Sequence, residues 1–286
     1  MPARRPRRRP GHIDSGGRAA DLAGMTIQPT LFIPHGGGPC FFMDDPAGTW
    51  TKMGDFLRDL PALLPARPSA ILCISGHWET QGFRFTGKTR PGLLFDYFGF
   101  PPHTYELSWP VPGDPALAAR AAALLADAGL DAGIDADRDL DHGVFVPLKL
   151  SFPDADVPVV EMSLDAGLDP KRAHAAGRAL RPLRDEGVLI VGAGMSFHNM
   201  RAHGSGIDVT PPSRAFDDWL GAAVAEQDGR GERLAHWADA PAARWCHPRE
   251  EHLLPLMVAA GAAEGPGERV YEELLLGLAV SGYRFA

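Results

Sequence analysis

The chain has 286 residues, of which 45% are hydrophobic and 22% are charged, and its formal net charge is −8. This length suits one large α/β domain or two small ones, and we favour one. The charge is uneven, because residues 1–24 hold six arginines and two aspartates, so the remainder of the chain is strongly acidic. An acidic body argues against a core that binds nucleic acid, and no apolar segment is long enough to span a bilayer.

The first 25 residues are rich in arginine, proline and glycine, and they are predicted to form a disordered basic tail. They contain no hydrophobic run of signal-peptide length. An over-long start or a flexible tail is the simpler interpretation, and a basic arm for nucleic acid or an organelle address is the alternative. The chain has three cysteines, Cys40, Cys73 and Cys246, and no pair has the spacing of a zinc knuckle. An odd number of cysteines is most consistent with a reducing cytoplasm.

Apolar runs bounded by glycine or proline predict buried strands of the kind found in parallel sheets. These runs are 29–34, 69–75, 157–164 and 188–194, with a short strand at 130–136. Apolar spacing and capping residues predict the helices. The helical segments are 46–64, 114–129, 142–152, 170–187, 213–227, 230–238 and 249–260.

Two segments are less regular. Residues 81–113 are aromatic and rich in turn residues, which predicts a β-hairpin followed by a long loop. Residues 271–285 suit a helix, a strand or both. The alternation of strands and helices elsewhere predicts an α/β sheet covered on both faces, with a ligand crevice at the carboxyl ends of its strands.

Histidines follow several of these segments. His35 and His77 come at the ends of the first two predicted strands, and His198 lies a few residues past the strand 188–194. His252 sits near the start of the helix at 249–260. Each ring has a simpler explanation, such as a bond to a backbone carbonyl or a place in a loop. Three or four such rings meeting in one crevice would instead make a divalent metal site.

Other polar residues near these histidines have two interpretations each. His142, after aspartates at a helix start, suits a proton donor or a solvated cap. Glu79 suits an acceptor that orients a ring or a solvated carboxylate. Glu251 suits a metal ligand or a residue that favours the helix dipole. Because His247 and His252 are five residues apart, they do not share a helical face, so we expect only one to point at the site.

Five motifs in this order resemble the class III extradiol ring-cleavage dioxygenases, especially the branch typified by 4,5-DOPA dioxygenase. The motifs are PHGGGP, SGHWE, LDHGVFVPL, GAGMSFHN and EEHLLPL, and the stretch YFGFPPHTYEL is also similar. The resemblance runs from about residue 29 to the C-terminus, so residues 26–286 are expected to form one dioxygenase-like catalytic domain. It implies a single-domain α/β fold with a mixed, largely parallel central sheet flanked by helices.

The resemblance also implies roles for individual residues. His35, His77 and His252 would bind the metal, with His198 as a further ligand or an acid–base catalyst. His142 would position substrate or transfer a proton. The residues expected to contact substrate are His103, Tyr105 and Trp78. In the wider superfamily, the protocatechuate-cleaving members use a metal-binding triad of two histidines and one carboxylate. Here the third position is a histidine, His252, which resembles the DOPA branch.

The implied reaction cleaves a catechol-type ring with O₂ to a muconic semialdehyde-type product. Fe(2+) is expected for catalysis, because the reaction needs a metal that exchanges electrons, although Zn(2+) also suits three imidazoles. The expected partners are the catechol and O₂, with no nucleic acid and no membrane; a homo-oligomer is left open. A zinc hydrolase using metal-bound water and a non-enzymatic Memo-like binding protein are the competing hypotheses.

Overall fold

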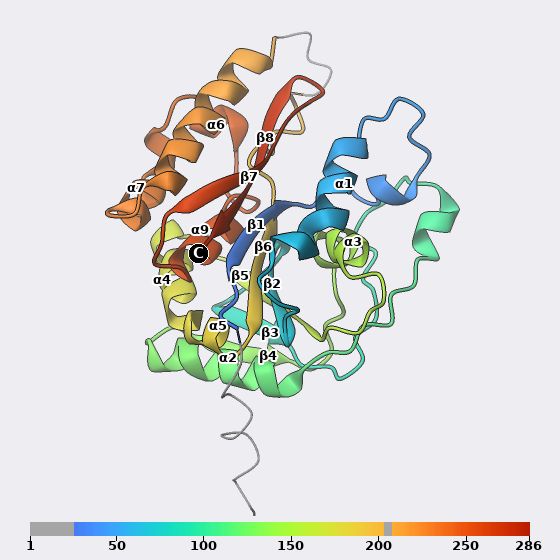
Figure 1. Cartoon of the computed structure of the whole chain (residues 1–286), viewed down its shortest axis with the longest axis vertical. Coiled ribbons are helices and arrows are strands. Elements are labelled where there is room, and N and C mark those ends of the chain that lie inside the picture. Colours follow the sequence, from blue (N-terminus) through green and yellow to red (C-terminus); the bar gives the residue numbers. More distant parts are fainter. Residues whose placement is uncertain (1–25, 203–207) are drawn as a thin grey trace, which may run out of the picture.

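The computed structural model describes residues 26–202 and 208–286, so the expected basic tail at 1–25 lies outside the described residues. The described residues form one eight-stranded sheet in the order β4-β3-β5-β2-β6-β1-β8-β7, with helices on both faces (Figure 1). Its strands are β1 (Thr30–Pro34), β2 (Ala70–Thr80), β3 (Phe83–Thr86), β4 (Ala132–Asp135), β5 (Val159–Asp165), β6 (Val188–Gly194), β7 (Gly267–Leu275) and β8 (Leu278–Phe285). The predicted fold class, a mixed and largely parallel sheet in a single α/β domain, is confirmed.

The helices lie in two layers. Among the described residues, α1 and α3 pack on one face of the sheet, and α2, α4, α6 and α9 cover the other (Figure 1). The α-helices are α1 (Thr51–Asp59), α2 (Pro115–Asp127), α3 (His142–Ser151), α4 (Pro170–Leu180), α5 (Pro182–Asp185), α6 (Thr210–Ala225), α7 (Arg230–Ala235), α8 (Ala243–Cys246) and α9 (Leu254–Gly261). The 3₁₀ helices are η1 (Cys40–Phe42), η2 (Leu60–Leu63), η3 (Pro102–Tyr105) and η4 (Trp237–Asp239).

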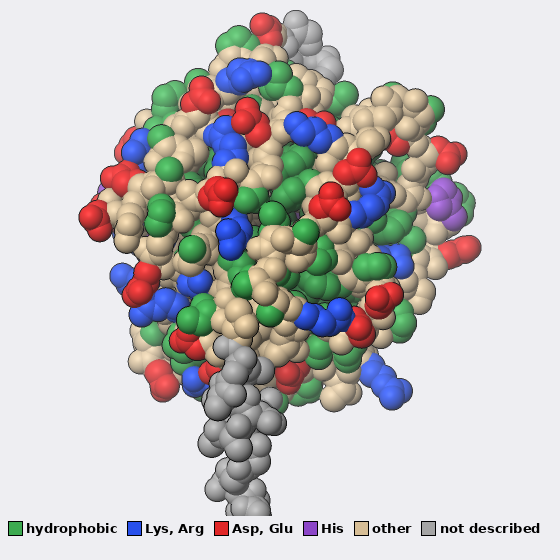
Figure 2. Space-filling view, viewed as in Figure 1, with side chains coloured by type: hydrophobic (Ala, Val, Ile, Leu, Met, Phe, Trp, Pro, Cys, Tyr) green, Lys and Arg blue, Asp and Glu red, His purple; other side chains and the backbone are tan. Residues whose placement is uncertain are grey.

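None of the helices in the described ranges is both long and apolar enough to cross a bilayer. Figure 2 shows acidic and basic side chains interspersed over one face of the molecule, with hydrophobic side chains between them. The apolar side chains of the strands instead form a continuous core, and β6 is buried along its whole length. A strand buried on both faces needs an uninterrupted apolar run, which is why VLIVGAG was recognisable from sequence.

The parallel centre of the sheet aligns the ends of three strands. β1 and β2 both pair in parallel with β6, and the register places Pro34 beside Gly194 and Ser75 beside Ala193. The backbone N–H of His35 then donates to the Gly194 carbonyl at 3.2 Å, continuing the ladder by one residue. The residues that follow β1 and β6 therefore emerge at the same edge of the sheet as the second half of β2.

β2 does not end at Ser75, as the sequence suggested, but continues to Thr80 through a bulge. Between Ile74 and Glu79 it advances five residues, while its partner β5 advances two, from Met162 to Leu164. A bulge bends the strand and redirects side chains locally. His77 lies inside this irregular stretch. It is therefore a residue of the strand itself, and not of a loop after it, and the bulge directs it toward the sheet edge.

Two segments differ from expectation or were undetermined. The predicted hairpin within 81–113 is wrong, because β3 is the only regular strand in this segment. β3 pairs with strands from elsewhere in the chain: with β4 in parallel and with β5 in antiparallel orientation. Residues 271–285 belong to an antiparallel hairpin of β7 and β8, which joins the sheet beside β1.

The chain before α9 packs against the end of β6. The backbone N–H of Met195 donates to the His252 carbonyl at 3.0 Å, which fixes that segment on the strand end. Gly194 permits the approach, because a Cβ there would lie 2.2 Å from the same carbonyl oxygen. A side chain at this position would push the His252 backbone away from the sheet.

We therefore expect Gly194→Ala to lower the free energy of unfolding by about 3 kcal/mol, a typical upper cost of overpacking. Denaturant titration followed by circular dichroism measures this. Gly167→Ala is the matched control, since Gly167 is exposed and a Cβ there meets its nearest neighbour, Asp165, at 3.8 Å. Equal losses in the two variants would contradict the packing argument.

Candidate metal centre

Three imidazoles from distant parts of the chain meet at the carboxyl edge of the sheet; those of His35 and His252 are buried and that of His77 is partly buried. His35 follows β1, His77 lies in the β2 bulge, and His252 precedes α9. The Nε2 atom of His77 lies 3.3 Å from the Nε2 of His35 and 3.3 Å from the Nε2 of His252. The His35 and His252 ring centroids are 5.1 Å apart, so the three rings surround one point.

The opposite nitrogen of each ring faces an acceptor. The Nδ1 of His35 lies 3.0 Å from the Gly36 carbonyl, and the Nδ1 of His252 lies 2.9 Å from Glu251 Oε1. The Nδ1 of His77 faces Asp96 Oδ2 at the longer distance of 3.8 Å. The hydrogen-bond partners of His35 and His252 place the ring proton on Nδ1 and leave the Nε2 lone pair free, the arrangement usual for histidines that bind metal. The negative charge of Asp96 favours the same tautomer of His77.

These rings are neutral at physiological pH. Burial, followed by the neighbouring imidazoles, lowers the pKa of His35 and of His252 well below the usual value. The same burial, together with His142, lowers the pKa of His77 to about 4. Because neutral imidazole is the form that binds cations, no proton has to be displaced near pH 7.

A divalent cation fits this donor set. With protons on Nδ1, three lone pairs point at one another with no hydrogen between them, which is unfavourable unless a positive charge lies at the centre. Two imidazole nitrogens bound at about 2.1 Å to one ion are roughly 3.0 Å apart at a right angle and roughly 3.4 Å apart at a tetrahedral angle. The 3.3 Å separations of the Nε2 atoms fall within this range.

Two further histidines flank the three rings, each with a carboxylate behind it. His142 opens α3, and its ring lies 4.0 Å from the His77 ring, centroid to centroid. Its Nδ1 lies 2.7 Å from Asp96 Oδ1, which also accepts the His142 backbone N–H at 3.0 Å. His198 stacks on His252 at 3.4 Å between ring centroids, and its Nδ1 lies 3.2 Å from Glu251 Oε1.

Each carboxylate thus serves one central ring and one flanking ring. Asp96 faces His77 and His142, and Glu251 faces His252 and His198. Burial raises the pKa of Glu251, but the hydrogen bonds from His198 and His252 outweigh it and hold that pKa well below its usual range. Burial also raises the pKa of Asp96, but the hydrogen bond from His142 acts in the opposite direction, and the pKa is lowered on balance. Both groups are therefore ionised and anchor their imidazoles.

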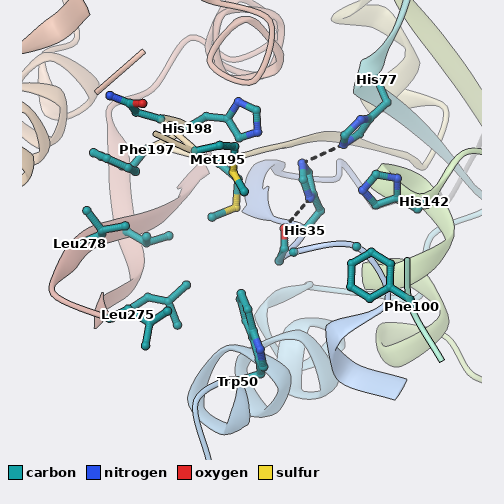
Figure 3. A pocket seen from close by; sticks show the side chains of 17 residues that line it. His35, Trp50, His77, Phe100, His142, Met195, Phe197, His198, Leu275 and Leu278 are labelled. Carbon is teal, nitrogen blue, oxygen red and sulfur yellow. Dashed lines mark hydrogen bonds between the residues drawn. The ribbon is translucent and has the colours of Figure 1, made fainter. Parts of the chain in front are cut away.

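A cavity of about 480 Å³ opens beside the cluster and is lined by His35, His77, His142 and His198 (Figure 3). Glycines 36–38 form its floor next to His35. Its remaining walls are mainly apolar and come from Trp50 just before α1, from Phe100, from the segment after β6 and from the β7–β8 hairpin. A planar aromatic molecule has room to reach the imidazoles from this side.

Three residues expected to contact substrate do not line this cavity. Trp78 follows His77 on β2, so strand alternation turns its indole to the other side, where the Arg138 guanidinium lies 4.8 Å from the ring centroid. His103 is exposed, and its Nε2 lies 3.0 Å from the Phe42 carbonyl. The Tyr105 hydroxyl bonds the backbone of Phe100 and Tyr97, so Tyr105 supports the loop that carries a cavity residue, Phe100.

The open interpretations of other residues are now decided by geometry. Glu79 orients no ring, because both its oxygens accept from Arg249 at 2.5 Å. Glu251 faces the Nδ1 side of His252, away from the point that the three Nε2 atoms surround. His247 is buried with its Nε2 2.9 Å from the Ser196 carbonyl, and so only His252 of that pair enters the cluster.

Asp96 is the functional residue that sequence reasoning missed. Its only signal was a single acid within the aromatic run LLFDYFGF, in a loop that the structure folds against α3. The apolar walls from β7 and β8 were also missed, because periodicity did not decide whether residues 271–285 formed a strand.

The cluster is expected to bind one divalent ion per chain. Calorimetric titration with Zn²⁺ should show the affinity of His77→Ala lowered by more than about 100-fold, since loss of an orienting partner alone costs about 10–100-fold. His103→Ala, which removes an exposed imidazole outside the cluster, should bind as the parent chain does. Unchanged binding in His77→Ala would show that the ion lies elsewhere.

The orienting role of Glu251 has an adjacent control. Glu251→Gln keeps the shape but removes the charge that faces His252 and His198, and we expect Zn²⁺ affinity to fall by about 10–100-fold. Glu250 instead pairs with Arg244 at 2.5 Å, so Glu250→Gln should leave the affinity unchanged. An equal loss of Zn²⁺ affinity in both variants would show that any nearby negative charge has this effect, and would contradict an orienting role for Glu251.

Comparisons with known proteins agree with this geometry. Residues 29–281 match the family described as the catalytic LigB subunit of aromatic ring-opening dioxygenase. The chain is 39% identical to the dioxygenase tasH of Hapsidospora irregularis, over 91% of this chain and 86% of that protein. It is 38% identical to the 4,5-DOPA dioxygenase extradiol of Beta vulgaris, over 87% and 91% of the two chains.

A crystal structure of an uncharacterized protein from Escherichia coli K12 has the same fold, with a TM-score of 0.73 and 29% identity. The match covers 91% of this chain and 100% of that one. The family match extends over the strands, the histidine cluster and most of the terminal hairpin. The chain therefore belongs to the LigB family of aromatic ring-opening dioxygenases and is a class III extradiol enzyme of the DOPA dioxygenase-like branch.

Proposed function

We propose that the protein is an iron(II)-dependent extradiol dioxygenase that cleaves a catechol-type ring with O₂ to a muconic semialdehyde-type product. The observation that carries the proposal is the convergence of three neutral imidazole Nε2 atoms beside a cavity that admits an aromatic ring. Family membership favours this chemistry over a zinc hydrolase and over a non-enzymatic binding module.

His35, His77 and His252 would hold the metal. Three facially arranged protein ligands leave positions for both oxygens of a catechol and for dioxygen. Iron(II), when bound, would supply the electron exchange that lets O₂ react with the ring, which zinc cannot do because it has no accessible redox change. The three neutral rings would add no negative charge to the metal, and the carboxylates of Asp96 and Glu251 face the Nδ1 side of the imidazoles rather than the Nε2 side.

His142 and His198 would handle protons. Each has its Nδ1 directed at a carboxylate, so Nε2 is the nitrogen available to the cavity. We assign one of these Nε2 atoms to accept a catechol hydroxyl proton and to return it to an oxygen of the ring-opened product. The paired carboxylate, Asp96 or Glu251, stabilises the imidazolium that forms in between. A positioned acid–base group of this kind contributes about 10²–10⁴-fold.

The test is anaerobic reconstitution with Fe(II), followed by oxygen-uptake and absorbance measurements over a panel of substituted catechols. We expect stoichiometric O₂ consumption and a yellow semialdehyde product. His198→Gln and His142→Gln should show which of the two transfers protons, through a loss in turnover of about 10²–10⁴-fold with metal content unchanged. His103→Gln, outside the cavity, serves as the control.

Two outcomes would change the proposal. If His198→Gln loses the metal as well as the activity, His198 is a ligand. Absence of O₂ uptake with every catechol, in protein shown to contain Fe(II), would reject the dioxygenase assignment for this chain.

A further inference from the structure

The cavity has two chemically different sides. The histidines occupy one side, and the opposite wall is apolar, with Leu275, Leu278 and Trp50 facing the histidines across the space in Figure 3. Leu278 and Val280 are buried on β8, and Phe197 follows β6. A ring whose hydroxyls meet the imidazoles must direct its substituent toward this wall.

The described residues of that wall offer no charged group. Among the described residues that line the cavity, none has a carboxylate, an ammonium or a guanidinium group. The polar side chain there, Asn199, is engaged: its Nδ2 donates to the Trp245 carbonyl at 2.7 Å and its Oδ1 accepts from the Arg201 backbone at 3.0 Å. The acids Asp96 and Glu251 stand behind the imidazoles and do not line the cavity.

The apolar surface continues outward to the solvent. Met200 and Leu276 line the cavity, yet their side chains are 68% and 62% exposed. Leu276 lies at the turn between β7 and β8 with a φ of 52°, so the hairpin holds a large apolar side chain at the mouth in a backbone conformation that leucine rarely adopts. An exposed apolar rim continuous with an apolar wall is typical of a binding surface.

We propose that the site, given the catechol chemistry above, takes catechols whose ring substituent is uncharged and apolar, an alkyl or aryl group, in preference to an amino-acid or carboxylate side chain. A carboxylate on this wall would lose water without gaining a partner, which is unfavourable. Each methylene buried against the wall instead favours binding by about fourfold. The wall residues of β7 and β8 and the rim residues Met200 and Leu276 determine this preference.

A matched pair of ligands tests the preference by binding alone. The probes are 4-propylcatechol and 3-(3,4-dihydroxyphenyl)propionate, whose side chains share two methylenes and differ in a terminal methyl or carboxylate. Calorimetric titration of the Fe(II)-loaded protein under anaerobic conditions should give a Kd at least about tenfold lower for 4-propylcatechol. Equal or tighter binding of the carboxylate, or no binding of either catechol, overturns the inference.

A charge placed on the rim should change the preference. Leu276→Arg adds a cation at an exposed position, so the fold is expected to tolerate it, and the ratio of the two Kd values should shift toward the carboxylate by about fivefold. The control is Leu274→Arg, because Leu274 also lies on the hairpin and is 43% exposed but does not line the cavity. An equal shift in both variants would assign the effect to net charge and contradict the role of Leu276.

The same samples separate this inference from the proposed function. After the titration, air is admitted and O₂ uptake is followed with each catechol. Tight binding of 4-propylcatechol without O₂ uptake would reject the dioxygenase activity and keep the substituent class. Uptake with both catechols, but with tighter binding and higher kcat/KM for the carboxylate, would keep the activity and reject the substituent class.

Discussion

The mutual orientation of three imidazoles is the constraint on which the rest of this structure depends. His35, His77 and His252 present unprotonated nitrogens to a common point, with 3.3 Å between the Nε2 of His77 and each of the other two. Burial keeps the rings neutral, and hydrogen bonds at Nδ1 keep the rings of His35 and His252 from turning. Such a cluster is a poor hydrogen-bonding arrangement and a good cation site, so the fold around it is best understood as support for a metal.

The two carboxylates link this centre to the flanking histidines, His142 and His198. Because Asp96 contacts both His77 and His142, and Glu251 contacts both His252 and His198, a change at a flanking ring alters the charge next to a metal-facing ring. In the proposed mechanism, a proton gained or lost at a flanking ring would therefore alter the environment of the metal on either side of the cluster. The remaining side of the cavity is apolar and uncharged among its described residues, so chemistry and substituent recognition are assigned to opposite walls.

Much of this arrangement followed from the sequence, for physical reasons. Continuous apolar runs favoured parallel strands, and residues that follow parallel strands gather at one edge of the sheet. The sequence therefore predicted that His35, His77 and His198 lie at the same edge. The bulge in β2 was not predictable, because nothing in ILCISGHWE distinguishes a strand that ends at Ser75 from one that bends and continues. Asp96 and the wall from β7 and β8 depend on contacts between distant segments. Trp78 was expected to contact substrate from the family resemblance, but it does not line the cavity.

Anomalous diffraction from crystals of the Fe(II)-loaded protein, grown and frozen without oxygen, tests the central claim most directly. The account predicts one iron peak per chain, bonded to the Nε2 atoms of His35, His77 and His252 at about 2.0–2.2 Å. Iron found between His198 and Glu251 instead, or no iron peak near the three Nε2 atoms in protein that contains stoichiometric iron, would contradict it.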